Sequence, residues 1–168
     1  TQRYAPVAVA TLVKGMNEGT VEVGTVGNEG MIGTPILLHA ATITTQAFIQ
    51  LVGDGYRIAA APVLQMVRNS PQAERLFFRY VQTAMDHLAQ WVACNRLHTL
   101  EARCARWLLM TADRAGGNQF LLTQEFLSYM LGVHRPAVSI AAGTLAGAGF
   151  IRYPRGQGVG VPLPRRPI

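Results

Sequence analysis

The sequence is poor in several features by which whole classes of protein are recognised. It has 2 cysteines in 168 residues, which excludes a disulfide framework, and we expect Cys94 and Cys104 to be free thiols packed within helices. The 4 histidines are scattered without the spacing of metal ligands, so no metal site is predicted. No stretch approaches the roughly 18–20 consecutive apolar residues of a membrane span, and no signal segment opens the chain. We therefore expect a cytoplasmic protein with no membrane partner.

Arrangements of catalytic groups are missing as well. No Ser-His-Asp, Cys-His or paired-carboxylate constellation stands out, and the 9 acidic residues lie far apart in the sequence. Since acid–base and nucleophilic catalysis need such groups together, we do not expect an enzyme. The glycines between Gly27 and Gly33 lack the lysine of a phosphate-binding loop and the spacing of a dinucleotide site, so we expect them to turn the chain. No cofactor is predicted.

Basic charge is concentrated near the C-terminus. The formal net charge is +6, and from residue 116 onward 5 arginines face a single acid, Glu125. Lys14 is the only lysine, and guanidinium groups are better suited than ammonium groups to bidentate contacts with phosphate or guanine. A solvated basic tail is one interpretation, whereas the placement beside a helix pair favours DNA. The five arginines are Arg135, Arg152, Arg155, Arg165 and Arg166.

The helix pair is predicted from residues 122–146, where two short helices meet at Gly132. Thr123 is a good N-cap, Glu125 favours the first turn of the first helix, and proline is tolerated in the first turn of the second. Glycine at the junction allows a tight helix-to-helix turn. The pattern favours a helix-turn-helix over an ordinary αα-hairpin. The residues expected to face inward are Leu127, Met130, Leu131, Val138, Ala141, Ala142 and Leu145.

Residues 4–62 alternate and turn like strands. Val21, Val23 and Val26 alternate with Glu22 and Gly24, which predicts a hairpin with one buried face. A strand near residues 48–52 is followed by a Gly-Asp-Gly turn and by residues 56–61, which continue the pattern. We interpret this region as the second half of a β-roll or jelly roll.

A long helix is predicted over residues 71–97, opened by Ser70 as cap and Pro71 in the first turn. One stripe repeats every three or four residues, which is typical of a dimer seam; a helix buried within one chain is the alternative. A second stripe, Leu76, Tyr80, Met85 and Val92, is expected to pack on the strand region. The seam consists of Phe77, Val81, Ala84, Leu88, Trp91 and Asn95. Thr99 should cap the next helix, with residues 95–99 as a hinge.

Three segments resemble the Crp/Fnr family of bacterial transcription regulators: GNEGMIGTPILL (27–38), ACNRLHTLEARCARWLL (93–109) and LTQEFLSYMLGVHRPAVS (122–139). The resemblance implies an α+β fold in three parts. These are a partial cyclic-nucleotide-binding-like β-roll over 1–69, a dimerisation helix and hinge over 70–98, and a winged helix-turn-helix over 99–168. Family members have further strands before this point, so we expect an N-terminally short roll.

In this family the start of the second helix reads bases, and Arg135 matches its principal guanine-reading arginine. Pro136 stands where a glutamate is usual and Ile140 where a second arginine is usual, so the recognition face is chemically sparse. The wing should span residues 151–161, with a Pro-rich end in place of the usual second strand. The DNA-contact candidates are Thr123, Gln124, His134, Arg135, Pro136, Ser139, Ile140, Arg152 and Arg155.

The family's effector pocket has only partial counterparts here. Cyclic-nucleotide-binding members carry a glutamate after the glycine matching Gly33 and an Arg-Ser pair later, whereas this chain has Thr34 and Thr44-Thr45. Each lost charge-assisted contact weakens binding by about 1.5–3 kcal/mol, so neither cAMP nor cGMP is expected. Two cysteines also cannot supply the four ligands of an iron–sulfur cluster. The effector remains unidentified.

The sequence thus predicts a homodimeric transcription regulator acting on a palindromic operator. Its expected partners are double-stranded DNA, a second copy of the chain and RNA polymerase. The alternative is a dimeric sensor or protein-interaction module that has lost specific DNA binding, an interpretation favoured by the sparse recognition face and the unusual tail.

Overall fold

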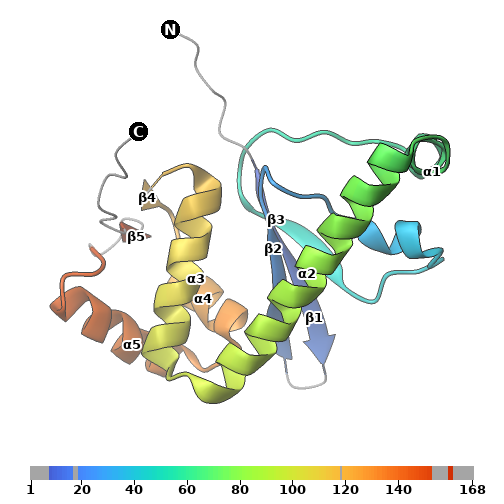
Figure 1. Cartoon of the computed structure of the whole chain (residues 1–168). Coiled ribbons are helices and arrows are strands. Elements are labelled where there is room, and N and C mark those ends of the chain that lie inside the picture. Colours follow the sequence, from blue (N-terminus) through green and yellow to red (C-terminus); the bar gives the residue numbers. More distant parts are fainter. Residues whose placement is uncertain (1–7, 17–18, 118, 153–158, 161–168) are drawn as a thin grey trace, which may run out of the picture.

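The computed structural model describes residues 8–16, 19–117, 119–152 and 159–160, and it has the predicted α+β fold. A three-stranded antiparallel sheet has the order β2-β1-β3 (Figure 1) and consists of β1 (Val9–Met16), β2 (Gly19–Val26) and β3 (Gln46–Leu51). The predicted hairpin is therefore confirmed. None of the described helices is both long and apolar enough to cross a membrane.

The connection from β3 to the helices differs from the prediction. Residues 55–59 have no regular structure and α1 (Ala60–Asn69) begins directly after them, so the prediction of strand-like structure over 56–61 is wrong. The apolar run after Gly33 forms the short 3₁₀ helix η1 (Thr34–Leu38). Apolar content alone does not distinguish a short strand from a short helical turn, so the strand-like pattern predicted over residues 4–62 does not hold for this segment.

Helix α2 (Pro71–Leu97) has the predicted bounds. The Ser70 hydroxyl accepts a hydrogen bond from the amide of Ala73 at 3.2 Å, which satisfies one free donor of the first turn. Further along, the Tyr80 hydroxyl accepts from the amide of Met31 at 3.0 Å and is 3.2 Å from its carbonyl oxygen. The sheet domain and the long helix are therefore linked through this tyrosine.

The two predicted stripes of α2 are only partly correct. Tyr80 packs toward the sheet domain as expected, but Leu76, Met85 and Val92 are 69%, 59% and 63% exposed, so their predicted packing on the sheet is wrong. Trp91, expected in the dimer seam, is buried within the chain. The face of α2 that packs against the rest of the chain is thus rotated about the helix axis relative to the predicted face.

The C-terminal part packs three helices around one core: α3 (Leu100–Ala115), α4 (Gln124–Leu131) and α5 (Arg135–Gly147). Thr99 caps α3 as predicted, and Gly116 ends it in the left-handed conformation. Two short strands, β4 (Gln119–Phe120) and β5 (Val159–Gly160), pair antiparallel. A second strand therefore does form in the wing region, in contrast to the prediction.

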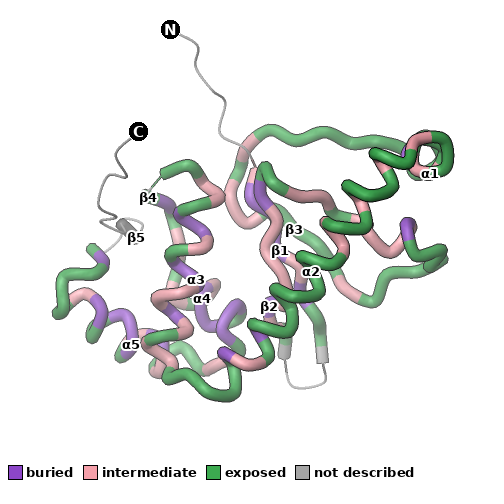
Figure 2. The backbone as a smooth tube through the Cα atoms, viewed as in Figure 1, coloured by how far each residue is buried: buried purple, intermediate pink, exposed green. Residues whose placement is uncertain are grey.

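The core of the helical part extends into the sheet. Val13 of β1 belongs to the same buried cluster as α3, α4 and α5, and helix α4 lies against β2. In Figure 2 buried segments occur on α5, near α3 and α4, and on the strands of the sheet. The buried cluster comprises Val13, Cys104, Trp107, Leu108, Ala112, Phe120, Leu127, Met130, Leu131, Val138, Ala142, Leu145 and Ile151.

A buried carboxylate lies where the sheet meets α3. Glu22 is only 5% exposed, although the alternation of β2 placed it on the polar face. The pairing explains the error, because Leu12 lies opposite Gly24 whereas Val13 lies opposite Glu22. This β-bulge leaves Val23 as an extra residue, so Glu22 shares the inward face with Val13. The indole N–H of Trp107 donates to its Oε2 at 2.5 Å, and Thr25 donates to its Oε1.

Burial raises the pKa of Glu22 above its ordinary value of 4.5, and the bonds from Thr25 and Trp107 and the charge of Arg106 offset only part of this. A group with a raised pKa in the folded state binds its proton more tightly when folded. Its contribution to stability is therefore complete below the unfolded pKa and is lost as the pH rises through the folded pKa.

We predict that Glu22→Gln changes the pH dependence of stability. The amide keeps an oxygen for the Trp107 bond but does not ionise, so the free energy of unfolding of the wild type should fall relative to the variant above pH 4.5. One group can supply a slope of at most about 1.4 kcal/mol per pH unit. Urea unfolding between pH 4.5 and 8 measures this difference, with Glu29→Gln as the control. A difference that does not vary with pH would contradict the assignment.

Candidate nucleic-acid interface

The turn between α4 and α5 has the geometry predicted for a helix-turn-helix. The Thr123 hydroxyl accepts from the amide of Phe126 at 3.0 Å and begins α4. Gly132 ends it with φ +63°, and its N–H is directed at the carbonyls of the last turn. A side chain at this position would be strained. The first helix and its turn are therefore determined largely by Thr123 and Gly132.

Helix α5 presents the predicted faces. Val138, Ala141, Ala142 and Leu145 are all buried, as expected from their spacing. On the opposite side Arg135, Pro136 and Gly143 are exposed, and Ile140 is 69% exposed. Pro136 lies in the first turn, where its missing N–H breaks no helical hydrogen bond. The start of α5 thus offers one cation and two apolar side chains to a ligand.

A hydrogen bond joins the first turn of α4 to the second turn of α5. The Ser139 hydroxyl donates to Oε1 of Gln124 at 2.8 Å, so two DNA-contact candidates far apart in sequence lie in contact. The amide nitrogen of Gln124 then remains a donor for a phosphate oxygen. His134 occupies the N-cap position of α5, but its side chain forms no capping hydrogen bond. It is exposed beside Arg135.

The remaining candidates lie toward the wing. Arg152 is exposed, next to the buried Ile151 that anchors the chain in the core. Arg155 lies outside the described residues. Most of the predicted contact residues therefore surround the first turns of α4 and α5, and Arg152 extends the set on the C-terminal side.

Arg103 was not identified from the sequence, yet it connects the hinge to the helix-turn-helix. Its Nη2 donates to the carbonyl of Leu131 at 2.5 Å, and its Nε donates to Asn95 at 3.2 Å. The pKa of Arg103 is lowered by burial and by the nearby charge of Arg106. The carbonyl of Leu131 belongs to the last turn of α4, where a cation is favourable. No local pattern marks such a residue, because both of its partners lie on other helices.

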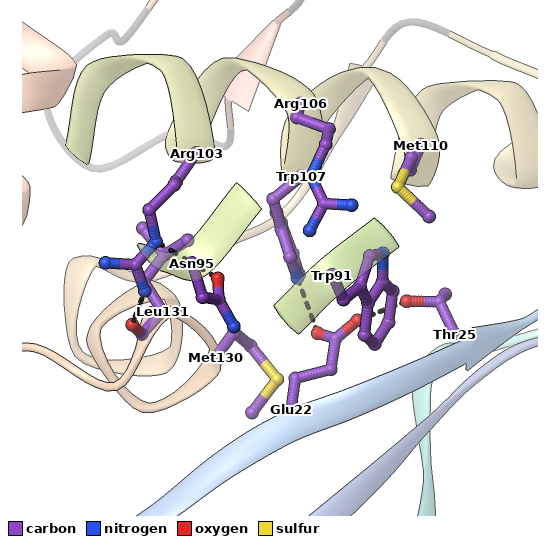
Figure 3. A pocket seen from close by; sticks show the side chains of 10 residues that line it. All are labelled: Glu22, Thr25, Trp91, Asn95, Arg103, Arg106, Trp107, Met110, Met130 and Leu131. Atoms are coloured by element: carbon purple, nitrogen blue, oxygen red, sulfur yellow. Dashed lines mark hydrogen bonds between the residues drawn. The ribbon is translucent and has the colours of Figure 1, made fainter. Parts of the chain in front are cut away.

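The effector candidates lie in the connection between β2 and β3. Gly33 has φ +102° at the start of η1, Thr34 begins that helix, and the carbonyl of Thr44 accepts from Lys14 at 3.0 Å. Thr45 is half-buried nearby in sequence. A cavity lies elsewhere, at the junction of β2, α2, α3 and α4, and Figure 3 shows the side chains that line it.

The residues of the predicted dimer seam lie in different environments, some exposed and others packed within the chain. Val81 is half-buried, and Leu88 and Ala84 are exposed on α2, whereas Trp91 lines the junction cavity. Asn95 is engaged by Arg103. Phe77 is half-buried. Among the apolar residues of the predicted seam, Ala84 and Leu88 are therefore the ones that the described chain leaves exposed.

Residues 102–166 match the Crp-like helix-turn-helix domain. A comparison with curated proteins finds no significant match to the sequence. Among solved structures, a CRP-family transcriptional regulator from Thermus thermophilus is similar, with a TM-score of 0.72 at 17% identity, covering 94% of this chain and 80% of its own. FixK2 from Bradyrhizobium japonicum has a TM-score of 0.70 at 13% identity, covering 95% and 81%.

A Crp/Fnr-family protein from Eubacterium rectale has a TM-score of 0.71 at 15% identity, covering 94% of this chain and 74% of its own. At these identities the structural likeness establishes the fold. The domain match places the helix pair around Gly132 in a helix-turn-helix DNA-binding domain, and the Thermus thermophilus and Eubacterium rectale proteins are described as transcriptional regulators. Residues 102–166 therefore carry a Crp-like helix-turn-helix DNA-binding domain, and the chain has the fold of Crp/Fnr-family transcription regulators.

Proposed function

We propose that this protein is a sequence-specific regulator that binds a palindromic operator as a homodimer. The observation that carries the proposal is the exposed guanidinium of Arg135 at the first turn of α5, the helix whose other face is fully packed in the core. A bidentate contact from arginine to guanine O6 and N7 is the commonest specific contact in the major groove. We expect Thr123, Gln124, His134 and Arg152 to contact the phosphate backbone beside this base.

Few side chains are available for reading the remaining bases. Pro136 and Ile140 supply apolar surface, which suits a thymine methyl group, and Ser139 is engaged with Gln124. We therefore expect specificity to rest on one guanine per half-site, with the other positions less strictly defined. In a dimer, the two recognition helices would bind half-sites about 34 Å apart.

Dimerisation is supported by an apolar stripe along α2. Phe78, Met85, Leu88 and Val92 are exposed, Val81 is half-buried, and the five residues follow one another at steps of three, four, three and four. That is the repeat of a coiled-coil seam, and an apolar stripe of this kind on an exposed helix is expected to be covered. The stripe shares Val81 and Leu88 with the seam predicted from the sequence, and Met85 and Val92 take the places of Ala84 and Trp91.

The effector is proposed to differ from a typical cyclic nucleotide. Thr34, Thr44 and Thr45 offer hydroxyl groups where a carboxylate and a guanidinium would be needed, and the backbone of Thr44 is already bonded to Lys14. RNA polymerase is a further proposed partner. An activator would contact it from the operator-bound dimer.

We predict that Arg135→Ala relaxes base preference without abolishing binding. Losing one bidentate contact should reduce discrimination at a single guanine per half-site by about 1–3 kcal/mol. Arg152→Ala is the matched control, because loss of a phosphate contact weakens binding evenly across sequences and reduces the salt slope by about one per subunit. Selection from a random duplex pool at two salt concentrations, performed on the wild type and on both variants, measures these effects.

An enriched palindrome that loses its guanine preference only in Arg135→Ala would support the proposed function. Unchanged preference in that variant would contradict the role of Arg135. Salt-sensitive binding without any enriched motif in the wild type would instead favour a sensor or interaction module whose helix pair no longer reads sequence.

We predict that Leu88→Glu produces a monomer. A charged side chain in the apolar stripe opposes burial of the stripe between two copies. A monomer would bind a single half-site, so its affinity for the operator should be about 10²–10⁴-fold lower. Leu76→Glu is the matched control, since Leu76 is an exposed leucine on the other side of the same helix. Light scattering coupled to size-exclusion chromatography measures the mass. A dimer that survives Leu88→Glu but not Leu76→Glu would place the seam on the opposite face.

A further inference from the structure

The cavity at the junction between modules has an unusual lining. It is enclosed by Glu22 and Thr25 of β2, by two residues of α2, four of α3 and two of α4, and its volume is about 20 Å³ (Figure 3). A space of that size holds a water or a small ion, and it is too small for a nucleotide. The α-helical lining residues are Trp91, Asn95, Arg103, Arg106, Trp107, Met110, Met130 and Leu131.

Arg106 is the group in this lining that lacks a partner. Among the residues that the structure describes it forms no hydrogen bond and no salt bridge, and its Nε is buried without an acceptor. Its guanidinium carbon lies 5.3 Å from the centre of the Trp91 ring, which orients the group without satisfying its donors. A guanidinium has five N–H donors, and a buried donor left unsatisfied is unfavourable.

The balance of charge around the cavity is positive. Arg103 lies close enough to Arg106 for the second charge to lower the pKa of the first. The single carboxylate, Glu22, has one oxygen bonded to Thr25 and the other to Trp107, and it forms no salt bridge with Arg106 in the described part of the chain. Two cations and a single carboxylate therefore face the cavity.

We propose that this cavity binds a small oxyanion of the phosphate, sulfate or carboxylate class, held by Arg106 with Arg103 as the second cation. Such an ion supplies the acceptors that Arg106 lacks and offsets the repulsion between the two arginines. Asn95 adds an amide on the side of the hinge. The carboxylate of Glu22 opposes a second negative charge in the cavity, which favours an ion of low charge.

Occupancy of this site acts on the arrangement of the modules. The walls come from the sheet, from α2 and from two helices of the DNA-binding domain, so an ion bridging Arg103 and Arg106 favours the arrangement in which these elements converge. A ligand shifts a conformational equilibrium only by its differential affinity for the two states. The site therefore provides a means of regulation separate from the effector positions at Gly33 and Thr44, and it does not depend on operator recognition.

Intrinsic fluorescence tests the proposal directly, because the chain has 2 tryptophans and both line the cavity. The full chain is titrated with sodium sulfate, phosphate or acetate at constant ionic strength maintained with chloride. We expect a saturable change in emission with at least one of the three oxyanions, together with a rise in the melting temperature. Chloride alone should produce neither effect.

Two variants distinguish the cavity from other anion sites. Arg106→Gln should abolish the saturable change, and Arg106→Lys, which keeps the charge but loses the planar donors, should weaken it by about tenfold or more. Arg79→Gln removes an exposed arginine of α2 outside the cavity and should leave the titration unchanged. The lysine variant keeps the test informative if the glutamine variant does not fold, which circular dichroism establishes beforehand.

The proposal fails if no oxyanion alters the emission of the wild type beyond chloride, since the cavity then holds only water. It also fails if the change persists in Arg106→Gln, because the ion then binds elsewhere. Binding that is lost equally in Arg79→Gln would mean general screening of a basic surface rather than a site.

Discussion

The carboxylate of Glu22 lies almost entirely out of water, between a strand and the first helix of the DNA-binding domain, and is held there by an indole and a hydroxyl group. Burying a carboxylate is unfavourable unless it is hydrogen-bonded, so these bonds require Trp107 and Thr25 to stay in register. Trp107 also belongs to the core that packs α4 and α5. This polar contact therefore joins the packing of α4 on β2 in setting the position of α4 and α5 relative to the sheet.

Local features of the fold could be predicted because they depend on residues within a few positions of one another. Ser70, Thr99 and Thr123 each cap the helix expected from them. The inward residues of α5 follow from helical spacing, and Gly132 follows from the conformation that the turn requires. The exposed face of α5 could be predicted for the same reason, since it is the remaining face of a helix whose buried face follows from its spacing.

Features that depend on distant partners could not be predicted. Glu22 is separated from Trp107 by 85 positions in the sequence, and the bulge that turns it inward is invisible in a simple alternation of apolar residues. Likewise, the rotation of α2 that buries Trp91 and exposes Met85 is decided by what packs against the helix, since both stripes are apolar. Arg103 and Arg106 have ordinary sequence surroundings, and their significance comes from the elements that converge on them.

Two independent structural constraints favour glycine at position 132. It takes a left-handed conformation at the end of α4, and a β-carbon there would approach Cγ2 of Val21 at 3.1 Å. The same residue, Gly132, thus affects both the angle between α4 and α5 and the distance of this helix pair from the sheet. A saturation screen at this position would find it intolerant without revealing which constraint was broken, and shortening Val21 to alanine would relieve only the second. Gly143 and Gly147, with open space around them, have neither constraint and leave α5 free to acquire new side chains.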